Sequence, residues 1–180
     1  MARVDADRLA MQAGRDLSLT AAQVRVQDDA RLEAGRDIRF DTLTERHGER
    51  IVADRRNRHD LDTRKEVGTT LAAGGNLTAV AGRDIDARAA DVTAGKHLGV
   101  GAQRDINLRA GEQAGSARDE SYYKTSGFFS SKTTHTIQST DWTRAQGTTF
   151  TGETASLLAG RDLKLAGANA GAQQDLLLFG

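Results

Sequence analysis

The sequence lacks several features on which whole classes of protein depend. Among its 180 residues there is no cysteine and no proline, and only eight residues are aromatic. The absence of cysteine excludes a disulfide framework and any thiolate metal ligand or nucleophile. No apolar run approaches the roughly 20 residues of a membrane-spanning helix, and the first residues lead into no apolar segment of a signal peptide. The 25 basic and 25 acidic residues give no net charge, which argues against general nucleic-acid binding.

The chain instead carries 19 glycines, many of them in a regular repeat. The string Ala-Gly-Arg-Asp followed by Leu or Ile occurs four times, and weaker copies stand between these. The step from Asp16 to Asp37 equals the step from Asp84 to Asp105, and both give a period of about 21 residues, which is typical of a solenoid. Half-motifs upstream of these aspartates divide each unit into a shorter and a longer part. We assign a structural role at one corner of the repeat to Gly14, Asp16, Gly35, Asp37, Gly82, Asp84, Asp105, Gly160 and Asp162.

Short alternating segments follow the corner motifs, which indicates strands. Leu17-Ser18-Leu19 reads apolar, polar, apolar, and Val24-Arg25-Val26 offers a further short strand in the longer part of the unit. Strands this short bury a face only by stacking on their equivalents in the next repeat. Helical periodicity never lasts beyond about one turn, and glycine interrupts it. We therefore predict an all-β chain, residues 1–180 forming one right-handed parallel β-helix with rungs of about 21 residues.

The corner residues have an expected role within each rung of this β-helix. We expect the glycine before Arg-Asp to provide the backbone freedom of a sharp corner. The aspartate is expected to accept hydrogen bonds from nearby backbone N–H groups. About six such rungs fit the length of the chain, and the apolar residues that follow each corner would form a ladder inside them. Leu17 and Ile38 should be stacked neighbours, as should Ile85 and Ile106.

The period fails twice, and each failure predicts an excursion from the β-helix. The first, at about 42–69, is densely charged with nearly balanced signs, and we interpret it as a solvated hairpin or loop; an Arg-lined site for anionic glycans or lipid headgroups is the alternative. The interval from Asp37 to Asn76 exceeds the repeat arithmetic by five positions. The second excursion, at about 110–150, exceeds it by fifteen.

The second excursion holds six of the eight aromatic residues, between Ser, Thr and Lys. We interpret it as an extra-helical β-hairpin with an aromatic tip, or as an irregular rung. Aromatic side chains gathered in one excursion suggest contact with a partner, whereas the alternative is that they pack back and cover an open sheet face. The candidate contact residues are Tyr122, Tyr123, Lys124, Phe128, Phe129, Lys132 and Trp142.

These residues resemble a known family. The repeated Ala-Gly-Arg-Asp-Ile/Leu, together with the Ser-Tyr-Tyr-Lys-Thr-Ser-Gly-Phe-Phe-Ser-Ser-Lys-Thr-Thr-His-Thr segment at 121–136, is similar to the haemagglutinin repeats of filamentous haemagglutinin-type exoproteins. These are large bacterial adhesins and contact-dependent growth-inhibition toxins exported by two-partner secretion. The resemblance covers essentially the whole chain. It implies a right-handed parallel β-helix within a longer secreted fibre at the bacterial surface, and no catalysis in this region.

The resemblance also implies partners: the rest of the exoprotein fibre, the outer-membrane two-partner transporter during export, and a protein, glycan or lipid of the target-cell surface. The sequence departs from a complete exoprotein because it has no signal peptide, no recognisable secretion domain and no toxin tail. We therefore expect an internal fragment, a truncated reading frame or an excised piece of such a protein, which puts the export of this particular chain in doubt.

The chemistry-bearing residues do not favour an enzyme. A β-helix that cleaves acidic polysaccharides is the alternative function, but the carboxylates here recur at the same corner of every rung, whereas catalysis requires a unique constellation. The four histidines stand at no spacing that a zinc site prefers. The glycine pattern is neither a phosphate loop nor a calcium-binding nonapeptide repeat. We expect no catalytic residue, no metal, no cofactor and no nucleic-acid partner.

Overall fold

The computed structural model describes residues 2–180, and these contain strands and no helix. In this part of the chain no helix is long and apolar enough to cross a membrane. The chain divides into two compact units. The first is a solenoid formed by Met1–Leu43, Glu66–Gly111 and Ala145–Gly180, and the second is a hairpin sheet formed by Thr44–Lys65 and Glu112–Arg144.

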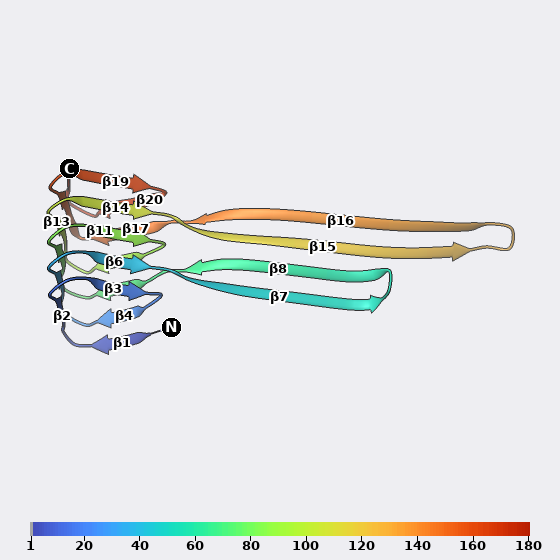
Figure 1. The fold of residues 1–180 in the computed structure, drawn as a ribbon, viewed down its shortest axis with the longest axis horizontal. Coiled ribbons are helices and arrows are strands. Elements are labelled where there is room, and N and C mark those ends of the chain that lie inside the picture. Colours follow the sequence, from blue (N-terminus) through green and yellow to red (C-terminus); the bar gives the residue numbers. More distant parts are fainter. Residues whose placement is uncertain (1) are drawn as a thin grey trace. The chain divides into compact units, whose positions relative to one another are not determined.

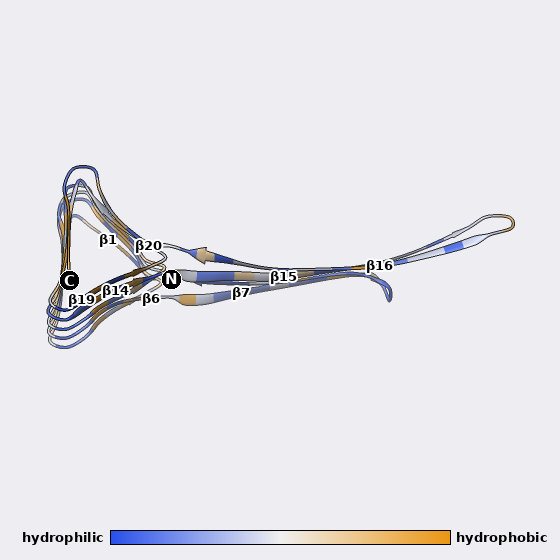
Figure 2. Cartoon of the chain, turned by 90° about the horizontal axis from the view of Figure 1, so that it is seen from above, coloured by the Kyte–Doolittle hydropathy of each residue, from blue (hydrophilic) through white to orange (hydrophobic). Residues whose placement is uncertain are grey.

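The solenoid consists of three parallel sheets (Figure 1). Each of the first five rungs contributes one strand to every sheet in turn, and the last rung contributes β20 and β21 to the first two. The first sheet contains β1 Arg3–Ala6, β4 Gln23–Val26, β9 Thr70–Ala73, β12 Asp91–Ala94, β17 Thr148–Gly152 and β20 Ala168–Ala172. The second contains β2 Leu9–Ala13, β5 Ala30–Ala34, β10 Leu77–Ala81, β13 His97–Ala102, β18 Thr154–Ala159 and β21 Leu176–Phe179. The third contains β3 Leu17–Thr20, β6 Ile38–Asp41, β11 Ile85–Arg88, β14 Asp105–Arg109 and β19 Asp162–Ala166. Viewed from above, the stacked rungs have a three-sided outline (Figure 2).

The register confirms the predicted length of the rung. Leu17 pairs with Ile38 and Ile85 with Ile106, each directly opposite the other in parallel strands. Because every rung places an apolar residue at these positions, the side chains form ladders inside the solenoid, and Ile38, Ile85 and Ile106 are fully buried. Phe40 and Phe150 are also fully buried, and their rings meet edge to face at 6.1 Å. The prediction of a parallel β-helix is therefore confirmed.

Both excursions are β-hairpins, and each insertion is longer than the sequence arithmetic suggests. Leu77 pairs with Ala30, across an interval more than twice the regular period, so the insertion there exceeds the length of a whole rung. Ala155 pairs with Leu98 across an interval that is longer still. The repeat arithmetic gave excesses of only five and fifteen positions because it assumed one further complete rung between Asp37 and Asn76 and another between Asp105 and Thr154. Neither interval contains such a rung, so these excesses were wrong.

The hairpins join in one four-stranded antiparallel sheet, which the sequence did not predict. The first consists of β7 Leu43–Asp54 and β8 Asn57–Val67, and the second of β15 Gly111–Ser126 and β16 Ser131–Gln146. Their order in the sheet is β16-β15-β8-β7, so that β8 and β15 pair across the two hairpins. For the second excursion, the hairpin interpretation is confirmed and the irregular rung is wrong.

The hairpins replace one particular corner of the rung, the one that leads from the third sheet to the first. The first, third and fifth rungs close this corner with Ala21, Ala89 and Gly167, which all have positive φ values of 46°, 47° and 64°. The second and fourth rungs insert a hairpin there instead. Tight corners and hairpins therefore alternate along the solenoid.

Candidate functional site

The repeated carboxylates form ion pairs between successive rungs. Arg36 donates to Asp16 from both Nε and a terminal nitrogen, at 3.0 and 2.6 Å. Arg104 contacts Asp84 in the same two-pronged way, at 3.0 and 2.5 Å. In each pair the arginine stands just before the aspartate of its own rung and reaches the aspartate of the preceding one. We call this series, which Arg83–Asp37 and Arg161–Asp105 complete, the Arg–Asp ladder.

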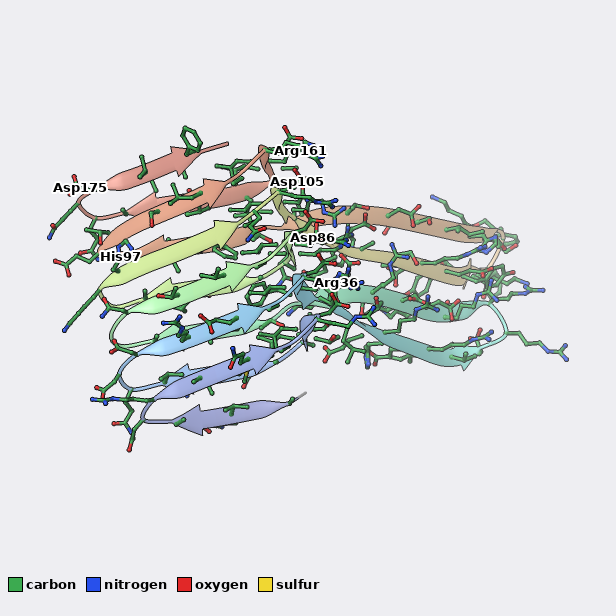
Figure 3. The ribbon with its side chains drawn as sticks, turned by 60° about the vertical axis from the view of Figure 1, so that its left-hand side comes forward. Arg36, Asp86, His97, Asp105, Arg161 and Asp175 are labelled. Atoms are coloured by element: carbon green, nitrogen blue, oxygen red, sulfur yellow. The ribbon has the colours of Figure 1, made fainter. Side chains whose placement is uncertain are left out.

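The ladder lies along one side of the solenoid, where Figure 3 shows Asp105 beside Arg161. Hydrogen bonds from the arginines lower the pKa of the carboxyls of Asp16, Asp84 and Asp105. Asp37 is almost completely buried, between Arg39 at 2.8 Å and Arg83 at 3.3 Å. Its contact with Arg83 is an ion pair without a well-formed hydrogen bond. An arginine of the next rung lies beside each of these four aspartates, although only three of them accept its two-pronged hydrogen bonds.

Two details of the predicted corner need correction. The expected bond from a backbone N–H to the carboxylate is present at Asp84, which accepts one from Asp105 at 3.3 Å, but the main partner of each ladder aspartate is an arginine side chain. Gly35 has no positive φ; it is required because a β-carbon there would lie 2.3 Å from the carbonyl oxygen of Gly14. The glycines at this corner thus permit close stacking of rungs, and the backbone-freedom argument was wrong for them.

Polar residues also bridge the rungs at the corner between the first and second sheets. Asp29 accepts a hydrogen bond from the backbone N–H of Asn76 at 2.8 Å. His97 follows one rung later, and its Nδ1 lies 2.9 Å from the hydroxyl of Thr154. His97 is therefore part of the repeat. No group of three or more His, Cys, Asp or Glu residues within 2–180 could hold a metal ion.

Opposite charges hold the two hairpins together where β8 meets β15. Arg58 lies 2.9 Å from Glu120, and His59 lies 2.5 Å from Asp119. Asp60 is directly opposite Arg118 in the same register. The two contacts and this opposite-charge position favour one alignment of β15, because a shift by one residue would place Asp60 opposite Asp119 or His59 opposite Arg118. The hydrogen bond to Asp119 and the negative charge of this carboxylate raise the pKa of His59.

Two of the candidate contact residues pack against other residues of the hairpin sheet. The ring of Tyr122 lies under the guanidinium of Arg56 at 4.5 Å and beside the ring of His135 at 6.2 Å. Trp142 covers Gly115 so closely that a β-carbon on this glycine would lie 2.5 Å from the indole. Both aromatic side chains are half-buried. An aromatic ring that covers a strand glycine is a known device for stabilising a sheet.

The other five candidates are exposed at or near the hairpin tip. Phe128 and Phe129 are 96% and 97% exposed in the turn between β15 and β16, and their rings meet at 5.2 Å. Tyr123, Lys124 and Lys132 are exposed on the adjoining strand ends. From Ser121 to Thr140 the chain has no acidic residue. The tip can therefore present apolar rings and positive charge together.

The sequence reading missed a motif that closes both hairpins. Gly-Thr-Thr stands at 68–70 and again at 147–149, at the start of β9 and β17. The hydroxyl of Thr69 is fully buried, donates to the carbonyl of Leu19 at 2.9 Å and accepts from the N–H of Ala22 at 3.2 Å. Thr148 bonds in the same way to backbone groups of Arg109 and Ala90. The repetition of the tripeptide was the available signal.

Comparisons with known proteins agree with this architecture. A family model described as "Hemagglutinin repeat" matches residues 53–176. The chain is 37% identical over 139 residues to the 16S rRNA endonuclease CdiA of Enterobacter cloacae. The matched region covers 77% of the chain and 4% of that relative. The chain is 33% identical to the tRNA nuclease CdiA of Escherichia coli over 96% of the chain, and 33% identical to the deoxyribonuclease CdiA of Dickeya dadantii over 89%. It spans 5% of each of the latter two. No solved structure matches the chain significantly.

Proposed function

Because the chain belongs to the haemagglutinin-repeat family, we propose that it is a non-catalytic structural segment of a much longer secreted exoprotein displayed at the bacterial surface. The observation that carries this proposal is the Arg–Asp ladder, in which the aspartates of four successive rungs are each paired with an arginine of the next rung. Carboxylates held in this way stabilise a stack and leave no unique pair for acid–base chemistry. Residues 1–180 act as one repeat domain in which the solenoid sets reach.

Within such an exoprotein the segment has three partners: the neighbouring rungs of the fibre, the outer-membrane transporter during export, and the surface of the target cell. Contact with that surface takes place through the tip of the second hairpin. Phe128 and Phe129 expose almost their whole rings to water, which costs free energy unless a partner covers them. Lys124 and Lys132 add positive charge suited to an anionic envelope, and their aliphatic stems can lie along apolar surface.

The proposal of contact is tested by removing the two rings while preserving the fold. The purified chain and its F128S/F129S variant are compared for binding to isolated bacterial envelopes and for melting temperature. Binding should fall at least tenfold while the melting temperature stays unchanged, because neither ring is buried. Y122S serves as the control: it should lower the stability of the hairpin sheet, because Tyr122 is packed between Arg56 and His135. Unchanged binding by F128S/F129S would contradict the proposal that the hairpin tip contacts the target-cell surface.

The polysaccharide-acting alternative is tested on the same preparation. The chain is incubated with acidic polysaccharides, and their chain length is measured. We expect no depolymerisation. Cleavage by the wild-type chain that is lost in D84N would overturn the structural proposal, since Asp84 would then serve chemistry as well as stacking.

A further inference from the structure

The returning strands of the two hairpins share a motif that is longer than Gly-Thr-Thr. Residues 62–70 and 141–149 both read Asp, two residues, Lys or Arg, two residues, Gly-Thr-Thr. Asp62 and Lys65 lie on β8, and Asp141 and Arg144 lie at the corresponding places on β16. The two strands therefore re-enter the solenoid in equivalent ways.

One edge of β8 is already used. β15 runs antiparallel to it, with Ser116 opposite Asp62 and Gln113 opposite Lys65. The equivalent edge of β16 has no strand beside it anywhere in residues 2–180, because β16 is the last strand of the sheet. A strand edge with unpaired N–H and C=O groups is a template for another strand.

The connectivity explains which strand would come next. β7 leaves after the second rung, β8 returns to the third, β15 leaves after the fourth, and β16 returns to the fifth. Four consecutive rungs each supply one strand, in the order that the strands have in the sheet. Rungs and sheet strands share a spacing of about 4.8 Å, so a hairpin inserted two rungs further on would supply the next strand.

We infer that the free edge of β16 is the acceptor for the outgoing strand of another haemagglutinin-repeat hairpin, aligned as β15 is on β8. This inference rests on the proposal that the segment belongs to a longer solenoid. In this register Asp141 faces the counterpart of Ser116, and Arg144 faces the counterpart of Gln113. The hairpins of the exoprotein thereby form one continuous second sheet.

The charges on β16 fit such a strand. β7 is the other outgoing strand of this chain. Ile38 and Ile106 both pair with Ile85 and so hold equivalent places in their rungs. Counted from these two residues, Glu45 of β7 corresponds to Gln113 of β15. A strand like β7, set on β16 in the inferred register, places the counterpart of Glu45 opposite Arg144. It also places the counterpart of Asp54 opposite His135. The first pairing joins opposite charges, and in the second a carboxylate can accept a hydrogen bond from the imidazole.

The edge itself is suited to pairing. β16 carries several β-branched threonines and Ile137, contains no proline, and has only Lys132, Asp141 and Arg144 as permanently charged residues along its whole length. Neither Lys132 nor Asp141 makes an ion pair within residues 2–180. Strand edges exposed to solvent without a partner are usually protected by charge or proline, and β16 has little of either.

The test uses the equivalence of the two motifs to add a third hairpin. The segment from Gly68 to Gln146 is duplicated directly after Gln146, so that Gly-Thr-Thr follows both copies and two rungs separate the second hairpin from its duplicate. D141C in the first copy is combined with S116C in the duplicated segment. Because the chain has no native cysteine, a disulfide that forms within one molecule under mild oxidation reports this pair, and cross-linked dimers are separated from it by non-reducing gel electrophoresis. Residues directly opposite each other in antiparallel strands lie within the range of a disulfide.

Two controls make the outcome decisive. D62C/S116C in the natural chain reports the pairing that the structure shows, and S139C replaces D141C in the duplicated chain as an out-of-register partner. We expect D141C to cross-link to the same extent as the natural control, and S139C at least tenfold more slowly. If the duplicated chain melts cooperatively and the natural control cross-links, but D141C does no better than S139C, the inference is overturned while the proposed function stands. A duplicated chain that does not fold contradicts both, because the solenoid then cannot be extended.

Discussion

A β-carbon on Gly35 would lie 2.3 Å from the carbonyl oxygen of Gly14 on the neighbouring rung, whereas a β-carbon on Gly14 would meet nothing within 4 Å. The same corner glycine is therefore indispensable in one rung and replaceable in another. The difference comes from stacking, since Gly14 belongs to the first rung and faces no strand of the described chain on its other side.

This pair yields a matched comparison. G35A should reduce the free energy of unfolding by about 1–3 kcal/mol, because the new methyl group forces the rungs apart. G14A should stay within about 0.5 kcal/mol of the wild type. Thermal unfolding followed by circular dichroism measures both; equal losses would mean that backbone conformation, and not stacking, selects glycine here.

The apolar ladder predicts a second contrast. I38D places a charge at a fully buried position between Leu17 and Ile85, which costs several kcal/mol because no partner is available. The cooperative unfolding transition should be lost. I51D changes a residue that is 55% exposed on β7 and should leave the transition of the solenoid in place. A well-folded I38D variant would contradict the assigned core.

A third comparison of two variants concerns the buried threonine of the Gly-Thr-Thr motif. T69V keeps the shape of the side chain but leaves the N–H of Ala22 and the carbonyl of Leu19 without their bridging hydroxyl. The expected cost is about 1–3 kcal/mol. T70V, at the exposed neighbouring position, is the control. Chemical denaturation of the two variants gives the comparison, and equal midpoints would show that the hydroxyl bridge contributes nothing.

The Arg–Asp ladder makes stability depend on pH. Arginine lowers the folded-state pKa of Asp84 and Asp105 below the value of about 3.9 in the unfolded chain. The pairs therefore stabilise the fold above that pH, and the contribution is lost as the pH falls through the folded pKa.

D84N/D105N should melt a few degrees below the wild type at pH 7, and the difference should narrow as the pH falls below about 4 and the wild-type carboxylates become protonated. D91N changes an exposed aspartate that lies outside the Arg–Asp ladder and should behave like the wild type throughout. Melting temperatures measured between pH 2 and 7 test this. A difference in melting temperature that stays the same across this whole pH range would trace the loss to packing and not to charge.

We expect the isolated chain to self-associate through its exposed last strand, β21. Leu176, Leu177, Leu178 and Phe179 of β21 are 41–66% exposed, and one edge of this strand has no partner in the described chain. Sedimentation velocity should show species larger than a monomer as the concentration rises, and L177K/F179K should reduce them. A monomer at high concentration would contradict the prediction.

Sequence reasoning succeeded wherever the regular period holds. The pairs Leu17–Ile38 and Ile85–Ile106 and the strand at Val24–Val26 follow from the repeat and from the alternation of apolar and polar residues. The aromatic hairpin tip was found by the failure of the period and by the aromatic residues gathered there. Sequence reasoning failed where the contact joins segments outside the period. The pairing of β8 with β15 depends on Arg58, His59 and Asp60 meeting residues of the other hairpin that are far away in the sequence, and charges in a solvated segment give no indication of their partners. The arginines of the ladder were overlooked for the same reason, because an Arg next to an Asp in sequence can equally well point into water.

Tight corners and hairpins alternate at a single position of the rung, which has a consequence for how the family can diversify. Ala21 and Gly167 close this corner with one residue of positive φ, whereas Thr69 and Thr148 close it after insertions that are each longer than a whole rung. The hairpins contribute no residue to the buried ladders. Mutations that change the length or sequence of a hairpin therefore leave the packing of the solenoid core unchanged. The length and sequence of the hairpins can therefore vary at little cost to the stability of the solenoid, whereas stacking constrains the residues of the rungs.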